Sequence, residues 1–146
     1  NGLMESGSSF GHGAYLGPDF TADYLHRAAL IAIDHYGGPA SEAARQTIDD
    51  FKTNRYDSGT RALTYTAAQA AAFEQLVASY ADFLGTPTTK YGLRPSAITD
   101  PRQIRQLTAF FSWSAWAVTV TGSVLTTAQT SKEAPAGFQH LGLRQA

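Results

Sequence analysis

The feature that most limits the fold is a long stretch without charged side chains in the C-terminal third of the chain. From residue 106 to 131 there is no Asp, Glu, Lys, Arg or His, and the strongly apolar part covers 109–120. A helix that crosses a bilayer needs about 20 mostly apolar residues, so the apolar part is too short. Three interpretations fit: the first half of a membrane helix, a helix that packs on a missing partner surface, and a buried core helix.

Composition excludes several classes of function. The chain has 146 residues, which favours one domain, and a formal net charge of −1, which offers no basic surface to nucleic acid or to an anionic membrane. It contains no cysteine, which excludes disulfides, a CxxCH haem attachment, a cysteine nucleophile and thiolate metal sites. Because it begins without Met, we expect it to be a piece of a longer protein.

Periodicity and capping signals predict a mainly α fold of about four helices and one short β-hairpin. The predicted elements are helices over 19–36, 40–52 and 66–84, a hairpin over 55–65, and a helix from 100 to about 120. Asp19 and Thr21 are each suited to cap the first helix, Thr66 and Gln69 form a capping box, and Asp100 followed by Pro101 starts the last. Residues 121–146 have no periodicity, so we expect weak order there.

The apolar pattern also predicts which side of each helix is buried. In the second helix we expect Ala44, Ile48 and Phe51 to be buried, and Asp49 with Asp50 to lie on a solvated face. The residues expected to form the buried stripe of the fourth helix are Ile104, Leu107, Phe111, Ala115 and Val118. Trp113 and Trp116 are three residues apart and fit either a core or interface role or a membrane boundary.

Four metal-competent side chains gather near the N-terminus: His12, Asp19, Asp23 and His26. Asp23 and His26 are three residues apart on one helix face, so His12 could complete a small oxygen and nitrogen site. Their spacing matches no specific metal signature. Carboxylates in the first turn of a helix also stabilise its dipole, and we favour this structural interpretation.

Residues 7–27 combine Gly-Ser, an aromatic residue, Gly-His-Gly at 11–13, Thr-Ala-Asp at 21–23 and Leu-His-Arg at 25–27. This stretch resembles the segment after the first membrane helix of quinol-type, single-chain nitric oxide reductases. Residues 53–66 resemble the hairpin of that family, and residues 107–117 resemble the approach to its second membrane helix. Order and spacing fit over residues 1–118, whereas the chain departs from the family pattern after about Val120.

The resemblance implies a parent enzyme of the large-subunit family that reduces nitric oxide to nitrous oxide with quinol electrons. It also implies a membrane bundle with two b-type haems and a non-haem iron, whose ligands lie on later membrane helices. No catalytic, cofactor-binding or metal-binding residue therefore carries over to this fragment. The soluble part is expected to resemble a cytochrome c fold without its haem. We expect a soluble domain over 1–120 and a divergent, weakly ordered tail over 121–146.

We expect the domain to be inactive alone and to cap the extracytoplasmic (periplasmic or outer) face of the membrane bundle of the same parent chain. The residues expected to matter are a structural polar network of His12, Tyr15, Asp19, Asp23, His26 and Arg27, and an interface of Phe110, Phe111, Trp113 and Trp116. Two alternatives stay open. One is a stand-alone helical interaction domain that forms a homo-oligomer through the Phe110 to Trp116 face, and the other is a small metalloenzyme using His12, Asp23 and His26.

Overall fold

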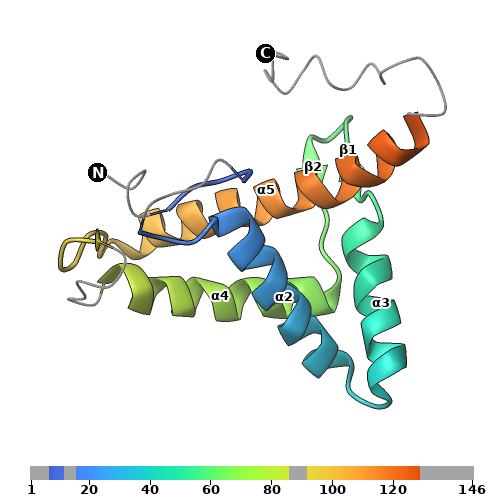
Figure 1. Cartoon of the computed structure of the whole chain (residues 1–146), viewed down its shortest axis with the longest axis horizontal. Helices are drawn as coiled ribbons and strands as arrows, with labels where there is room; N and C mark the ends of the chain where they lie inside the picture. Colours follow the sequence, from blue (N-terminus) through green and yellow to red (C-terminus); the bar gives the residue numbers. More distant parts are fainter. Residues whose placement is uncertain (1–6, 12–15, 86–91, 129–146) are drawn as a thin grey trace.

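The computed structural model describes residues 7–11, 16–85 and 92–128, with side chains up to residue 120. Its elements are α2 (Phe20–Tyr36), α3 (Ala40–Lys52), β1 (Tyr56–Asp57), β2 (Ala62–Leu63), α4 (Ala67–Gly85) and α5 (Pro101–Ala128). In these described parts the chain therefore contains four helices and one short hairpin (Figure 1). The predicted mainly α fold is confirmed.

The four helices pack around one shared core (Figure 1). Helix α2 contacts α3, α4 and α5, and α5 contacts all three other helices. In Figure 1, α5 lies above α4, α2 crosses them, and α3 stands at the end near the hairpin. Helices α2 and α5 thus each contact all the other helices of the bundle.

Aromatic rings fill the centre of this core. Phe20 of α2 stacks on Phe111 of α5 with ring centroids 4.5 Å apart, and Tyr80 of α4 packs edge-on against Phe111 at 5.2 Å. Apart from Tyr24, the remaining buried core is built from small and aliphatic side chains on the same helices and on the loop before α5: Ala28, Ala72, Leu76, Leu84, Leu93, Ile98, Ile104 and Ala115. Alanines allow close helix approach, and the rings then fill the larger gaps at the density that protein interiors require.

The helices begin where the sequence predicts. Asp19 caps α2, with its carboxylate accepting a hydrogen bond from Ala22 N. Thr66 and Gln69 bond reciprocally at the start of α4, since Thr66 N donates to Gln69 Oε1 at 3.0 Å and Gln69 N donates to Thr66 Oγ1 at 3.3 Å. Asp100 accepts from Arg102 N at the start of α5. These caps satisfy backbone donors that a helix leaves unpaired.

The hairpin is short and antiparallel. Tyr56 pairs with Leu63 and Asp57 pairs with Ala62. The Asp57 side chain closes the turn by accepting hydrogen bonds from the backbone nitrogens of Gly59 and Thr60. Two strands of this length are not stable alone, so the hairpin depends on its contacts with the helices, including the ring contact between Tyr56 and Trp116.

Helix α5 is longer than the sequence pattern predicts. It continues to Ala128, so residues 121–128, for which we expected weak order, are helical. Residues 129–146 lie outside the described part of the chain, and the domain boundary at 120 stays a prediction. Val118, predicted to be buried, is 43% exposed. Among the described residues no helix is both long enough and apolar enough to span a membrane.

Candidate functional site

Asp19 joins the N-terminal segment 7–11 to the start of α2. One of its carboxylate oxygens accepts from Ser8 Oγ at 3.0 Å and from Gly11 N at 2.7 Å, and the other accepts from Ala22 N at 3.0 Å. Partial burial acts to raise the pKa of Asp19, but these hydrogen bonds to the charged form outweigh it, and the pKa is lowered. The ionised carboxylate therefore stabilises the helix start and the segment together.

A second contact ties the same segment to α5. The backbone N of Phe10 donates to Thr21 Oγ1 at 3.1 Å, and Thr21 Oγ1 lies 2.8 Å from Ser114 Oγ. Both hydroxyl side chains are buried. Since the Phe10 ring also packs edge-on against Trp113 at 6.2 Å, the segment is held to α2 and to α5 at once.

Asp23 links α2 to α4. Its carboxylate accepts from the hydroxyl of Tyr80 at 2.7 Å and lies 3.5 Å from Arg27 Nη1, while Arg27 Nη2 donates to Ser79 Oγ. Burial of Tyr80, together with its hydrogen bond to the negative Asp23, raises the pKa of this phenol well above its usual range. The Arg27 guanidinium also lies over the Tyr80 ring, 5.4 Å from its centroid.

The structure brings together only part of the predicted polar network. Asp23 and Arg27 are paired, and Asp19 lies one turn earlier on the chain but binds the N-terminal segment. His26 is exposed. His12 and Tyr15 lie outside the described residues, so the network as a whole stays a prediction. Within the described ranges no group of three metal-competent side chains converges.

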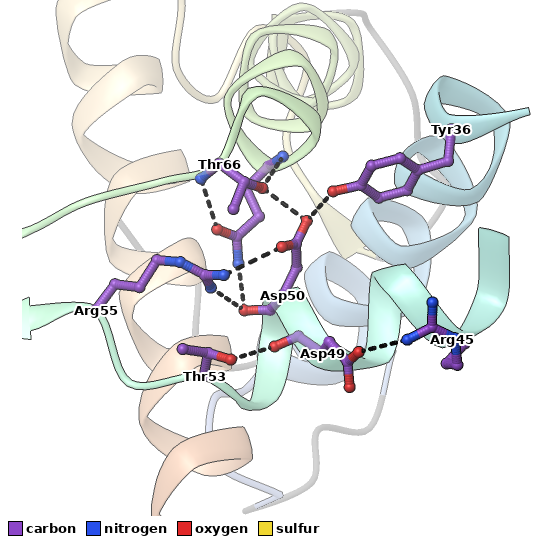
Figure 2. Close-up of polar contacts among 8 residues, drawn as sticks. Tyr36, Arg45, Asp49, Asp50, Thr53, Arg55 and Thr66 are labelled. Carbon is purple, nitrogen blue, oxygen red and sulfur yellow. Dashed lines mark hydrogen bonds and ion pairs between the residues drawn. The ribbon is translucent and has the colours of Figure 1, made fainter. Parts of the chain in front are cut away.

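A larger polar cluster surrounds Asp50, near the C-terminal end of α3 (Figure 2). One carboxylate oxygen accepts from Thr66 Oγ1 at 2.8 Å and from the hydroxyl of Tyr36, and the other lies 3.2 Å from Arg55 Nη2. Asp50 is only 7% exposed. The hydrogen bond to Asp50 raises the pKa of Tyr36. A buried carboxylate is tolerated here because charged and neutral donors surround it.

The backbone carbonyl of Asp50 is bound as well. It accepts from Arg55 Nη1 at 2.7 Å and from Gln69 Nε2 at 3.2 Å. The Asp50 cluster (Tyr36, Asp50, Arg55, Thr66 and Gln69) therefore connects the end of α2, the end of α3, the start of the hairpin and the start of α4.

This cluster was not predicted from the sequence. The predictions for Ile48 and Asp50 were wrong, whereas Phe51 does pack, partly buried, against the core. The buried side chains of α3 are Ala43, Thr47 and Asp50, whereas Ile48 is 53% exposed. Asp49 does face solvent, where it pairs with Arg45 at 3.2 Å. Arg55 and Thr66 are the partners that make burial of Asp50 favourable, so this carboxylate lies on the inward face of the helix. The available signal was that Ala43, Thr47 and Asp50 share one helical face.

The predicted interface residues lie in different environments. Phe110 is 43% exposed and stacks against Trp113 with centroids 6.3 Å apart, and Phe10 is 37% exposed beside the same indole. We call Phe10, Phe110 and Trp113 the aromatic patch. Phe111 is instead a core residue, 3% exposed, because it faces α2 and α4. Trp116 packs on Tyr56 of the hairpin, with centroids 5.6 Å apart.

The comparison with known families decides what kind of domain this is. The family model for the NorB cytochrome c-like domain of nitric oxide reductase matches residues 1–121. The chain belongs to this family. The resemblance to the large subunit of nitric oxide reductases is thereby confirmed. A search of curated proteins gave no match.

The described residues of this cytochrome c-like domain do not fit a covalently attached haem. Covalent attachment uses a CxxCH motif, and the chain has no cysteine. The centre of the bundle is filled by the stacked pair of Phe20 and Phe111. The two histidines in the described part, His26 and His35, are exposed on α2. The chain thus lacks the covalent attachment, and in the described residues aromatic rings occupy the centre of the bundle.

Proposed function

We propose that the chain is a non-catalytic, extracytoplasmic domain of a quinol-dependent nitric oxide reductase, in which it caps the membrane bundle that reduces nitric oxide to nitrous oxide. The family match over residues 1–121 carries this proposal. The b-type haems and the non-haem iron would then be held by the membrane bundle, and this domain would bind no haem of its own.

The distribution of polar groups supports a structural role. Asp19, Asp23 and Asp50 each accept hydrogen bonds from a neighbouring element, so each connects two or more parts of the fold. A catalytic acid or base needs access to a substrate. Asp50 is buried, and its carboxylate oxygens are occupied by protein donors.

The aromatic patch supports a covered position. Exposed aromatic residues that contact one another on a helix indicate an interaction surface more often than isolated apolar residues do. Phe110 and Trp113 lie in the stretch without charged side chains, on the helix whose other side forms the core. We propose that the membrane bundle of the same parent chain covers this patch.

The test is turnover per assembled haem in the full-length parent reductase carrying Asp23→Asn. A structural cap predicts less assembled enzyme, with quinol-driven nitric oxide consumption per haem within about twofold of wild type. Normal haem content with turnover lower by roughly 100-fold, the scale of removing a general acid or base, would contradict the non-catalytic role. Asp49→Asn, which changes an exposed carboxylate, is the matched control.

The exposure of Phe110 also favours a second candidate, a stand-alone helical interaction domain that dimerises through the aromatic patch. This candidate predicts a dimer of the isolated chain in sedimentation analysis that Phe110→Ser converts to a monomer. If the domain is instead a cap, Phe110→Ser is expected to leave the oligomeric state of the parent enzyme unchanged, because the membrane bundle already covers the patch there.

A further inference from the structure

A small cavity lies where the hairpin meets the helix bundle. Side chains from α2, α4, α5, the hairpin and the end of α3 line it, and its polar lining includes Tyr24, Arg55, Tyr65, Ser112 and Trp116. Its volume is about 20 Å³. A cavity needs roughly 10–15 Å³ to hold a water molecule, so this one has room for a water molecule.

One of the lining side chains has a donor without an acceptor in the described part of the chain. Trp116 Nε1 is buried, and among the described residues it has no hydrogen-bond partner. The indole N–H can only donate. Buried polar groups in folded proteins are almost always paired with protein or with ordered water, so an acceptor is expected beside this nitrogen. The contact with Tyr56 holds the indole in place.

The same cavity also contains hydroxyl groups whose acceptor lone pairs are not all used. The hydroxyl of Tyr65 lies 2.5 Å from Ser112 Oγ, and the hydroxyl of Tyr24 also bonds to Ser112. Each hydroxyl has one proton and two acceptor lone pairs. The three hydroxyls therefore retain unused lone pairs after they bond to one another, and a molecule with two protons can fill them.

We propose that this cavity is a binding site for one water molecule, which accepts a hydrogen bond from Trp116 Nε1 and donates its two protons to two of the three hydroxyls of Tyr24, Tyr65 and Ser112. Water has both the acceptor that the indole needs and the protons that the hydroxyls accept. Buried waters typically make about two to four such bonds. The bound water joins α5 to the base of the hairpin, next to the ring contact between Trp116 and Tyr56.

The test is an NMR measurement of magnetisation transfer between water and the two indole protons of the 146-residue chain. Trp116 Hε1 is expected to give a cross-peak whose sign indicates a long-lived bound water, whereas Trp113 Hε1 is not. Trp113→Phe assigns the signals and is expected to leave the Trp116 cross-peak unchanged. A Trp116 signal with no long-lived water contact would overturn the proposal.

A high-resolution crystal structure gives an independent readout. We expect ordered density within hydrogen-bond distance of both Trp116 Nε1 and one of the three hydroxyls in the wild-type chain. Trp116→Phe removes the donor, and density at the site is then expected to be lost. A structure in which Trp116 Nε1 bonds directly to a protein oxygen would contradict the water site. Both wild-type measurements decide the question even if the variant does not fold.

Discussion

Thr66 Oγ1 donates to Asp50 Oδ2 at 2.8 Å while it accepts from Gln69 N at 3.3 Å, so one hydroxyl both caps α4 and binds the carboxylate at the end of α3. Thr66→Val has the same shape but removes both bonds. We expect it to lower the free energy of unfolding by about 2 kcal/mol, measured by urea denaturation. Thr66→Ser keeps the hydroxyl and is expected to cost less than about 1 kcal/mol. Equal losses would contradict the dual role.

Asp50 is predicted to be the most sensitive carboxylate of the domain. Asp50→Asn leaves the Arg55 guanidinium without its charged partner and places an amide donor opposite hydroxyl donors. We expect a loss of about 3 kcal/mol in the free energy of unfolding. Asp49→Asn, one residue earlier on the exposed side of α3, is expected to cost about 0.5 kcal/mol or less. Similar losses for the two variants would refute the buried role of Asp50.

Asp19 is predicted to make stability depend on acid pH. Its pKa is lowered in the folded chain, so its contribution is present above the unfolded value and is lost as pH falls through the folded value. Asn also caps helices, so Asp19→Asn removes mainly the charge. The wild type is expected to be more stable than this variant by about 1 kcal/mol at pH 7. That difference in stability should shrink below about pH 4, where Asp19 becomes protonated. A difference that stays constant on further acidification would contradict the predicted role of the Asp19 charge.

Buried tyrosines are predicted to limit the stability of the folded chain at alkaline pH. Burial raises the pKa of Tyr24, Tyr65 and Tyr80 in the folded chain. Their contribution to stability is therefore full below about pH 10, the unfolded value, and is lost as pH rises through the folded values. Tyrosinate absorbance in the near ultraviolet should reach the amplitude of all seven tyrosines only when the far-UV circular dichroism shows unfolding. If the tyrosinate absorbance reached its full amplitude near the unfolded pKa while the chain was still folded, this prediction would be wrong.

Helix starts could be predicted from sequence because a cap is a local device. Asp19, Thr66 with Gln69, and Asp100 each bind backbone within their own first turn, so a window of a few residues contains both partners. The hairpin is equally local, since the Asp57 side chain closes its turn.

Burial was harder to predict, because it depends on partners far along the chain. Asp50 is buried through Tyr36, Arg55 and Thr66, which belong to three other segments. Apolar periodicity alone places Ile48 inside and Asp50 outside, and the structure shows the reverse. Phe111 and Phe110 are adjacent in sequence, yet one is in the core and the other is exposed. Only the packing direction of α5 separates their environments.

The most direct test of the cap is thiol protection at Phe110 in the parent reductase. The chain has no cysteine, so Phe110→Cys and Ile48→Cys introduce single probes at positions that are 43% and 53% exposed. In cells expressing a parent without other reactive cysteines, a membrane-impermeant maleimide should label Ile48→Cys and spare Phe110→Cys. Both should be labelled in the isolated chain. Equal labelling of the two probes in the parent would contradict the proposal that the membrane bundle covers the aromatic patch.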